Sequence, residues 1–320
     1  MRLLVTGGAG FIGSSFVRMI SNGTIDGISE LRVLDKLTYA GNLENLREID
    51  SDSFEFTKGD ICDVETVRRV SKHVDAIINF AAESHVDKSI SNPNDFVLSN
   101  VLGVQNLLNA SISNGVGKFV QVSTDEVYGS VGSGFSVEAD PILPNSPYSA
   151  SKASAELLVR SFHKTYGLHT IITRSSNNYG PFQFPEKLIP LFITNLIQDK
   201  RVPIYGTGKN IRDWIFVEEN CHAINQVMQN GKAGEIYNIG GNQQFTNLEI
   251  TSLILDLMNK DSNFIEFVRD RKGHDERYAL NNQKVAKEIG FVPKIQFRLG
   301  LEKTIDWYVR NENWWRKLVV

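Results

Sequence analysis

Residues 3–13 read Leu-Leu-Val-Thr-Gly-Gly-Ala-Gly-Phe-Ile-Gly, an apolar run that leads into glycines at positions 7, 10 and 13. The apolar run predicts a buried strand over Leu3–Thr6, and Phe11–Ile20 has the pattern of a helix. Gly7 permits the tight turn between them, Gly10 lets the backbone approach a ligand, and Gly13 lets the helix pack closely. Because the first turn of a helix attracts a diphosphate, this segment predicts a dinucleotide site.

An acidic residue follows at the place where such a site needs one. The second predicted strand, Leu31–Leu34, ends at Asp35, about 20 residues beyond the glycines, where a carboxylate binds the adenosine ribose. A carboxylate there repels a 2′-phosphate, so we expect NAD rather than NADP. Asp60 and Ile61 follow the third strand and are placed to reach the adenine, although Asp60 serves equally well as the N-cap of the next helix. The alternative is a glycine-rich turn without a ligand, which does not explain the strand, the helix and the acid together.

Apolar strands alternate with amphipathic helices through the first half of the chain. Further strands are predicted at Phe54–Thr57, Ala76–Phe80, Phe119–Val122 and Thr170–Thr173, and helices at Val64–Ser71, Pro93–Ser113 and Tyr148–Tyr166. This alternation predicts an α/β fold, with a doubly wound parallel Rossmann sheet and a smaller, interleaved C-terminal substrate domain.

The pattern changes after Asn178, where Tyr179-Gly180-Pro181 interrupts the chain. We therefore expect a dinucleotide-binding domain over residues 1–178 and a mainly substrate-binding domain over 179–320. Segments from about 210–241 are expected to return to the main sheet, because Asp213–Val217 and Tyr237–Gly241 have the pattern of strand ends. The tail, Leu301–Trp315, predicts an amphipathic helix whose tryptophans are packing anchors.

Composition and charge exclude several classes of protein. The chain has 320 residues, 41% of them hydrophobic, and a formal net charge of −3. This charge argues against a nucleic-acid partner, and no apolar run is long enough to cross a membrane. Cys62 and Cys221 lie far apart without neighbours at metal-ligand spacing, so we expect free thiols, no metal site and a reducing compartment. Since Arg2–Thr6 lacks the apolar core of a signal peptide, we expect a soluble cytoplasmic protein.

A tyrosine and a lysine lie one helical turn apart in Tyr148-Ser149-Ala150-Ser151-Lys152. Free tyrosine has a pKa near ~10 and is a poor base at neutral pH. We expect the charges of Lys152 and of a bound nicotinamide to lower this pKa, so that the Tyr148 phenolate removes a proton from an alcohol. The hydroxyl of Thr124 can form a hydrogen bond with the same alcohol oxygen. The alternative is an exposed pair on an amphipathic helix, and the cofactor motif argues against it.

Two adjacent acids, Asp125 and Glu126, follow Thr124 at the end of a predicted parallel strand. Once an alcohol is oxidised to a ketone, the neighbouring C–H becomes acidic. One carboxylate can remove that proton while one carboxylic acid protonates a departing hydroxyl, and two neighbouring carboxyls can hold these different protonation states. A solvated acidic turn is the alternative, but parallel sheets bind ligands at this edge.

Three further motifs make the chain similar to a known family. They are Ala81-Ala82-Glu83-Ser84-His85-Val86-Asp87, Thr124-Asp125-Glu126-Val127-Tyr128-Gly129 and Ser176-Asn177-Asn178-Tyr179-Gly180-Pro181. With the Gly-x-x-Gly-x-x-Gly spacing, they resemble the nucleotide-diphosphate-glucose 4,6-dehydratases of the extended short-chain dehydrogenase/reductase family, most closely those that act on dTDP-glucose. The resemblance implies an NAD-dependent hydro-lyase of deoxysugar biosynthesis, which converts dTDP-glucose to dTDP-4-keto-6-deoxyglucose and water.

The resemblance also implies roles for individual residues. Tyr148 is then the base for oxidation at C4, with Lys152 and Thr124 beside it. Asp125 protonates the departing 6-hydroxyl, Glu126 removes the C5 proton, and a hydride returns to C6. The implied cofactor contacts are Gly7, Gly10, Phe11, Ile12, Gly13, Asp35, Lys36, Asp60, Ile61, Ala81, Tyr148, Lys152 and Asn178. The implied substrate contacts are Ser84, Thr124, Asn177, Lys187, Leu188, Arg212, Asn247, Arg271 and His274.

Other functions stay open at this point. A UDP-sugar 4,6-dehydratase and a nucleotide-sugar 4-epimerase share most of these features, although related epimerases generally lack the Asp-Glu doublet. A non-catalytic dinucleotide sensor has no need for Tyr148, Lys152 and the acid pair together. The resemblance further implies a homodimer, in which the helices predicted at Pro93–Ser113 and Tyr148–Tyr166 pair across a two-fold axis.

Overall fold

The computed structural model describes residues 1–319. Its main element is a seven-stranded parallel sheet with the strand order β10-β6-β5-β4-β1-β2-β3. The strands are β1 (Arg2–Thr6), β2 (Glu30–Asp35), β3 (Glu55–Lys58), β4 (Ala76–Asn79), β5 (Lys118–Thr124), β6 (Thr170–Ser175) and β10 (Ile236–Ile239). The order reverses between β1 and β4, so the sheet is doubly wound and its ligand crevice is expected at the carboxyl ends of these strands.

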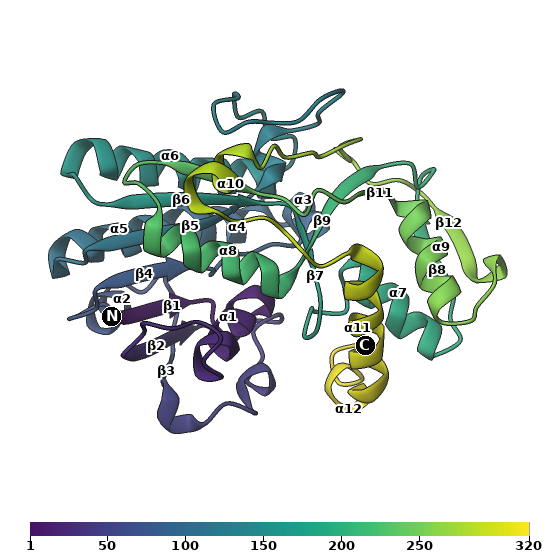
Figure 1. Cartoon of the computed structure of the whole chain (residues 1–320), viewed down its shortest axis with the longest axis horizontal. Helices are drawn as coiled ribbons and strands as arrows, with labels where there is room; N and C mark the ends of the chain where they lie inside the picture. The colour runs from purple at the N-terminus through teal and green to yellow at the C-terminus, as the bar shows by residue number, and fades with distance from the viewer. Residues whose placement is uncertain (320) are drawn as a thin grey trace.

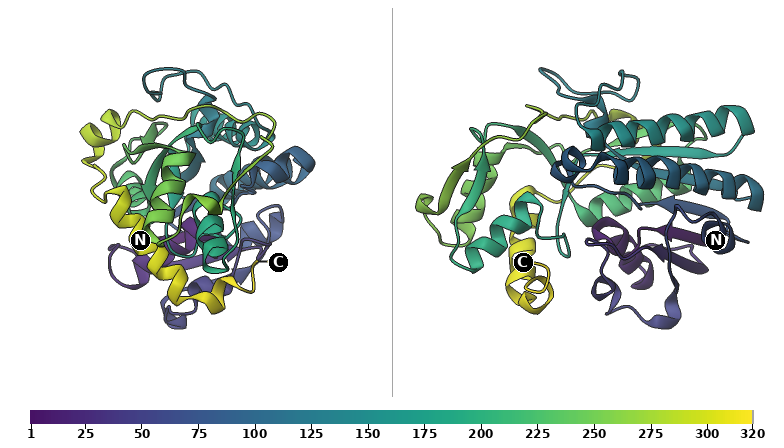
Figure 2. Two further views of the ribbon diagram at one scale, coloured as in Figure 1. Left: turned by 90° about the vertical axis from the view of Figure 1, so that its right-hand side faces the viewer. Right: turned by 180° about the vertical axis from the view of Figure 1, so that it is seen from behind.

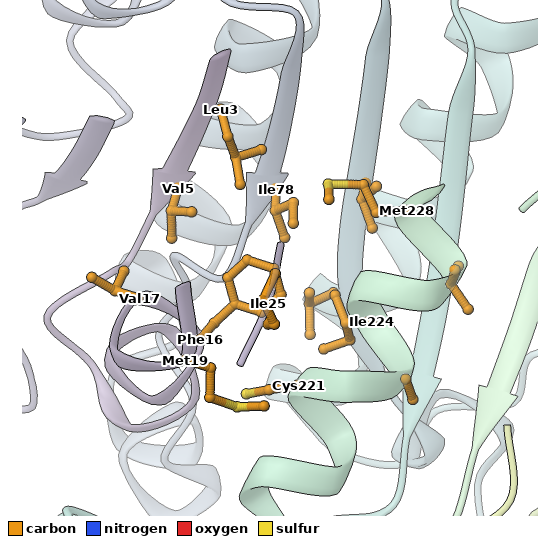
Figure 3. Close-up of a cluster of buried hydrophobic side chains, with 14 of the residues drawn as sticks. Leu3, Val5, Phe16, Val17, Met19, Ile25, Ile78, Cys221, Ile224 and Met228 are labelled. Carbon is orange, nitrogen blue, oxygen red and sulfur yellow. The ribbon is translucent and has the colours of Figure 1, made fainter. Parts of the chain in front are cut away.

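Helices cover both faces of this sheet (Figure 1). One face carries α1 (Phe11–Ser21), α8 (Val217–Asn230) and α10 (Gln283–Ile289), and the other carries α2 (Val64–Val70), α5 (Gly103–Asn114) and α6 (Pro147–Tyr166). Residues of β1 point alternately to the two faces: Leu3 and Val5 join the cluster with α1 and α8, whereas Leu4 joins the cluster with α5 and α6. Figure 3 shows the first cluster, where side chains of α1 and α8 meet against β1 and β4.

The helix predicted at Pro93–Ser113 is helical throughout but is not one regular α-helix. It consists of α4 (Pro93–Val97), a π-helical segment η3 (Leu98–Leu102) and α5. The wider turn places Asn100 in the interior, where its side chain is 1% exposed. Such π turns recur at functional sites.

A second group of elements lies beyond the carboxyl edge of the main sheet (Figures 1 and 2). It contains a sheet of β7 (Asn177–Tyr179), β9 (Ile211–Phe216) and β11 (Gln244–Thr246), and a pair formed by β8 (Val202–Tyr205) and β12 (Ile265–Val268). Its helices are α7 (Leu188–Ile197), α9 (Asn247–Leu257), α11 (Phe297–Arg310) and α12 (Glu312–Trp315). The remaining short elements are α3 (Val86–Ser91), η1 (Leu43–Leu46), η2 (Ser51–Ser53), η4 (Asp125–Tyr128) and η5 (Ser262–Phe264).

The prediction for the returning segments is half right. Tyr237 lies in β10, which joins the edge of the main sheet beside β6, as expected. Residues 213–216 belong instead to β9, which pairs with β7 and β11 in the small sheet, so their assignment to the main sheet is wrong. An apolar run marks a buried strand but does not say which sheet buries it. The chain returns through α8, which begins at Val217 and packs on the main sheet.

Local sequence explains why α6 begins where the site needs it. Ser146 is its N-cap and forms a capping box with Ser149, and Pro147 occupies the first turn. Both are strong start signals for a helix. The first turn of α6 therefore fixes Tyr148 near the carboxyl end of β5.

Candidate active site

The glycine loop between β1 and α1 has the geometry of a phosphate cradle. Gly7 has a φ of +71°, and a Cβ there would lie 2.5 Å from the backbone nitrogen of Ala81. A Cβ on Gly13 would lie 2.2 Å from the carbonyl oxygen of Gly7, so this glycine lets the helix close on the loop itself. Gly10 is the N-cap of α1 and no side chain caps the helix. The N–H groups of the first turn are thus left for an anion.

Asp35 holds the same loop at the end of β2. Its carboxylate accepts hydrogen bonds from the backbone N–H of Ala9 (2.9 Å) and of Leu37 (2.8 Å). Burial raises the pKa of Asp35, and these backbone donors oppose that shift. The side chain faces the groove that also contains Gly7 and Gly10, where a ribose hydroxyl could donate to it.

The expected adenosine contacts line one groove. Asp35, Lys36, Asp60, Ile61 and Ala81 all border it. Lys36 and Asp60 form an ion pair of 2.7 Å. The alternative role for Asp60 as a helix N-cap is wrong, because Asp63 caps α2. The groove continues past Phe11, Ile12 and Gly13 to Tyr148 and Lys152. These residues together fit an extended dinucleotide such as NAD.

Tyr148 and Lys152 are both buried on the first turns of α6. Lys152 Nζ donates to the carbonyl oxygen of Val122 on β5 at 2.7 Å, and burial lowers its pKa to about 8. Burial and the nearby Glu126 raise the pKa of Tyr148, and a hydrogen bond with Thr124 opposes them. The protein groups around Tyr148 raise its pKa, so the predicted lowering depends on the nicotinamide charge that the prediction also invokes. A phenolate at Tyr148 therefore needs a further positive charge, such as that of an oxidised nicotinamide.

The two acids begin η4 directly after β5. The Thr124 hydroxyl caps this turn: it accepts from the backbone N–H of Glu126 and donates to Asp125 Oδ1, both at 3.2 Å. Burial, then the charges of Glu126 and Asp213, raise the pKa of Asp125 well above its ordinary value. Burial also raises the pKa of Glu126, but Arg271, Arg212 and Lys187 oppose it. The surroundings raise the pKa of both carboxyls, and the basic groups near Glu126 favour holding a shared proton on Asp125 rather than on Glu126.

A second pocket opens beside Glu126, with a volume of about 290 Å³. It is bordered by eight of the nine expected substrate residues, namely Ser84, Asn177, Lys187, Leu188, Arg212, Asn247, Arg271 and His274. Thr124 lies behind it in the acid turn. Asn178, expected at the cofactor, borders this pocket rather than the dinucleotide groove. The pocket meets the nicotinamide end of the groove, because Ser84, Gln183, Glu186 and Lys187 border both.

The pocket is cationic and its polar groups are held in place. The Lys187 ammonium donates to the Ser84 carbonyl (2.8 Å), and the Arg212 guanidinium donates to the Asp275 carbonyl (2.9 Å) and stacks 4.3 Å from the Tyr278 ring centre. Arg271 Nε and Asn247 Oδ1 are buried without a hydrogen-bond partner among the described residues. The two arginines, with the free Nε donor of Arg271, and the lysine suit the oxygens of a diphosphate, whereas Asn247 Oδ1 can accept from an N–H or hydroxyl group of a ligand.

Several residues of the site were missed by sequence reasoning. Tyr205, Trp214 and Tyr278 border the substrate pocket, and Gln183 borders both cavities. Asn100 joins the π segment to α6, because its amide hydrogen-bonds both backbone groups of Glu83 (2.9 Å each) and Ser151 Oγ (2.8 Å). Sequence carries no local signal for Asn100, since a polar residue in a long helix is normally exposed.

Residues 1–319 show neither a metal-binding cluster nor a membrane-spanning helix. No group of three or more His, Cys, Asp or Glu side chains in this range is arranged to hold a metal ion. None of the helices described is both long enough and apolar enough to cross a membrane.

Comparison with known proteins places the chain in a family. The family model for GDP-mannose 4,6 dehydratase matches residues 4–304. A dTDP-glucose 4,6-dehydratase of Streptomyces antibioticus is 50% identical over 321 residues, which cover 99% of this chain and 95% of the relative.

Solved structures agree. The dTDP-glucose 4,6-dehydratase DesIV of Streptomyces venezuelae, with NAD and TYD bound, is 50% identical with a TM-score of 0.98, covering 99% of this chain and 100% of that one. A dTDP-glucose 4,6-dehydratase of Bacillus anthracis in complex with NAD is 46% identical with a TM-score of 0.91, covering 99% of each chain.

A doubly wound sheet with a glycine-loop groove and an adjoining cationic pocket defines a dinucleotide-dependent enzyme that acts on a phosphorylated substrate. Within that class, the chain belongs to the GDP-mannose 4,6 dehydratase family, and the three relatives described above, 46–50% identical, are dTDP-glucose 4,6-dehydratases. The predicted fold class and the predicted family are thereby confirmed.

Proposed function

We propose that this protein is an NAD-dependent hydro-lyase that converts dTDP-glucose to dTDP-4-keto-6-deoxyglucose and water, a step of deoxysugar biosynthesis. One observation carries the mechanism: a buried Tyr–Lys pair adjoins two carboxyls of which Asp125 is the more readily protonated, because basic side chains oppose protonation of Glu126. The Tyr–Lys pair suits oxidation of an alcohol, and the acid pair suits loss of water from the resulting ketone. The relatives support this substrate and this cofactor.

Tyr148 is the proposed base for the oxidation. Its phenolic oxygen takes the proton of the C4 hydroxyl, and the Thr124 hydroxyl hydrogen-bonds with Tyr148 and keeps its ring in place. Lys152, anchored on the Val122 carbonyl, directs its positive charge toward the same end of the groove. NAD, when bound, would supply the hydride chemistry for oxidation at C4 and reduction at C6. The residues that would hold it line the groove from Asp60 to Lys152.

Glu126 and Asp125 divide the elimination between them. The C4 ketone makes the C5 proton acidic, and an ionised Glu126 takes it. The electron pair of the C–H bond forms the C5–C6 double bond, while the C6–O bond breaks and the departing oxygen takes a proton from Asp125 as water leaves. Asp125 Oδ2 is buried without a partner among residues 1–319, which suits an acid that acts on a ligand. An epimerase has no use for this pair.

The cationic pocket is the proposed site for the nucleoside diphosphate. Arg212, Arg271 and Lys187 neutralise the two phosphates. Apolar walls beside them, from Leu188 to Phe192 and at Ile204, suit a flat base. The preference for thymine over uracil rests on the similarity to dTDP-glucose dehydratases.

The decisive test is an assay of the purified protein with dTDP-glucose, UDP-glucose and GDP-mannose. We expect the absorbance that 4-keto-6-deoxy sugars develop in alkali with dTDP-glucose, and turnover at least roughly ten-fold slower with the others, since pocket contacts discriminate by about 1–3 kcal/mol. Interconversion of dTDP-glucose and dTDP-galactose without the keto product would support an epimerase instead.

The proposed assembly is a homodimer. The exposed face of the η3–α5 helix carries Leu98 (50% exposed), Leu102 (40%) and Ile112 (41%), and α6 beside it carries Leu157 (57%). A second copy of the same two helices would cover this apolar face and complete a four-helix bundle. Both cysteines are free, which is consistent with the reducing cytoplasm that we propose as the compartment.

A further inference from the structure

We propose that the C-terminal helices form a strap that retains the bound dinucleotide, and that Trp314 acts as a positioning residue for the glycine loop through Asn45. This inference rests on the proposed function, because it concerns the NAD of that site. It assigns a cofactor-retaining role to the last helix of the chain, which borders neither the dinucleotide groove nor the substrate pocket.

A chain of two hydrogen bonds joins the tail to the loop. The Trp314 indole N–H donates to Asn45 Oδ1 at 2.9 Å, and the Asn45 amide N–H donates to the carbonyl oxygen of Ala9 at 2.9 Å. Asn45 is 2% exposed, its bond to Ala9 is buried, and its bond to Trp314 is partly buried. Ala9 lies between Gly7 and Gly10, and its N–H is held by Asp35. The position of the glycine loop therefore depends on Trp314, which lies 269 positions after Asn45 in the sequence.

A stacked cluster reinforces this contact. The Arg18 guanidinium donates to the Asn45 carbonyl at 2.8 Å and lies 3.9 Å from the ring centre of Phe182. Phe182 packs against Trp307 and Trp314, with centroid distances of 4.4 and 5.8 Å. Arg18 belongs to α1, so the helix that starts at the diphosphate site is tied to α11 and α12. Figures 1 and 2 show these two helices on the side of the second group that faces α1.

The C-terminal helices also hold the segment 182–186, which borders the groove. The Tyr308 hydroxyl donates to the carbonyl of Gln183, which borders both the groove and the substrate pocket. The next residue, Phe184, meets Tyr39 edge to face at 5.5 Å, and Lys88 bridges Tyr39 and Glu186. Phe184 therefore contacts the loop 36–42, whose Ala40 also borders the groove, while α11 and α12 hold the segment that contains Phe184.

Retention is useful in a reaction that is neutral in redox. Each turnover returns the cofactor to its starting state, so release is not needed for catalysis and loss of the dinucleotide would interrupt it. Widening the groove requires Phe182–Glu186 to separate from the glycine-loop side. The Trp314–Asn45–Ala9 bonds and the Arg18–Phe182 stack oppose that separation.

The test compares two tryptophans on the NAD-loaded enzyme. Trp314→Phe removes the N–H that reaches Asn45 but keeps an aromatic ring. Trp315→Phe is the matched control, because the Trp315 indole N–H donates to the main-chain carbonyl of Tyr308 (2.8 Å) and not to the Tyr308 hydroxyl that reaches Gln183, and Trp315 is fully buried. NAD dissociation is followed by chasing radiolabelled bound NAD with excess unlabelled NAD, at a temperature where both variants are folded by circular dichroism.

We expect Trp314→Phe to release NAD roughly 3- to 10-fold faster, the ratio that one neutral hydrogen bond supports. Trp315→Phe should lower the melting temperature more while leaving the release rate within about two-fold, because its partner is not in the loop. Trp314→Phe should also add little to Asn45→Ala, since both act through one link. An unchanged release rate in Trp314→Phe, or release rates that simply follow melting temperature in both variants, overturns the strap. A wild-type protein that binds no NAD overturns the proposed function instead.

Discussion

Asp125 and Glu126 are neighbours in the chain but differ in the charges around them. Carboxylates of Glu126 and Asp213 face Asp125, whereas Arg271, Arg212 and Lys187 act on Glu126. Asp213 is itself fixed by backbone N–H donors of Gly241 and Gln243. The acid and the base are thus distinguished by what the second group of elements brings to the end of β5.

The double variant Asp125→Asn, Glu126→Gln separates the two chemistries. It leaves Tyr148, Lys152 and the groove intact, so we expect oxidation at C4 to continue while elimination slows by about 10²–10⁴-fold, the usual range for general acid–base help. Reduced nicotinamide should then accumulate in a single turnover, which its absorbance reports. Tyr148→Phe is the control, and it should form almost no reduced cofactor. Absence of reduced cofactor in the double variant, or wild-type dehydration by it, would contradict the assigned roles.

The raised pKa of Asp125 also predicts a stability effect. Because its folded-state pKa lies above the unfolded value, the folded protein binds more protons, and stability falls as pH rises from the unfolded pKa through the folded one. Near pH 8 the single variant Asp125→Asn should therefore be more stable than the wild type, by on the order of 1 kcal/mol, and less active. The gain should shrink below about pH 4. Thermal melts at pH 8 and below about pH 4 would measure this gain in stability. A variant that is less stable than the wild type at pH 8 would contradict the claim that the buried Asp125 carboxyl destabilises the fold at that pH.

The π segment links two elements that carry the site. Asn100 bonds the backbone of Glu83 after β4 and Ser151 on α6, and the Ser151 hydroxyl bonds the Tyr148 carbonyl. Asn100→Ala should lower the free energy of unfolding by about 1–3 kcal/mol, because buried partners lose their bonds. We also expect slower oxidation of bound substrate with little change in KM, since Tyr148 loses its support. Urea melts and single-turnover absorbance measure the two effects. An exposed change away from the proposed interface, Asn230→Ala on α8, is the control and should alter neither.

The elements that sequence predicts well are those with local signals. The strand, glycines and helix at residues 2–21, and the capped start of α6 at Ser146, follow from propensity and capping alone. The π segment and the sheet to which β9 belongs could not be predicted this way, because both depend on contacts between segments distant in the chain. The helix predicted over Leu301–Trp315 is similarly divided into α11 and α12 at Asn311.

The residues of the candidate site also divide into those with a local sequence signal and those that depend on contacts between distant segments. Motifs around the glycines, the acid pair and Tyr148 mark residues whose spacing itself carries chemistry. Tyr205, Trp214 and Tyr278 have no such spacing and become visible only when β8, β9 and the 270–280 segment converge on one pocket. The predicted lowering of the Tyr148 pKa depends on the nicotinamide charge, because helical spacing shows that Lys152 is near Tyr148 but not what burial costs the phenolate.

The assembly of the whole molecule depends on the exposed face of α5 and α6. Leu157→Glu would place a carboxylate in the proposed two-fold interface, where an unpaired buried charge weakens association by roughly 100-fold or more. We expect the wild type to sediment as twice 35.9 kDa and the variant as 35.9 kDa at micromolar concentration. Leu299→Glu, on an exposed leucine of α11, is the control and should stay dimeric. A wild-type mass of 35.9 kDa would contradict the dimer.

The joined cavities make a prediction about the redox balance of the whole enzyme. Ser84, Gln183 and Lys187 border both the nicotinamide end of the groove and the substrate pocket, so one sugar can remain in place for oxidation, loss of water and reduction. The purified protein should therefore hold NAD and form product without added NAD, and reduced cofactor should never exceed the concentration of sites.

An isotope experiment tests whether the sugar stays in place. dTDP-glucose deuterated at C4 should yield product with deuterium at C6. The substrate can also carry a second isotopic label in addition to the C4 deuterium. When this doubly labelled substrate is mixed with unlabelled substrate, the deuterium should stay in the molecules that carry the second label, because the sugar does not leave between the steps. Scrambling of label between molecules would show that the ketone escapes. Reduced cofactor that grows in proportion to product would show a simple dehydrogenase, for which Asp125 and Glu126 would have no catalytic role.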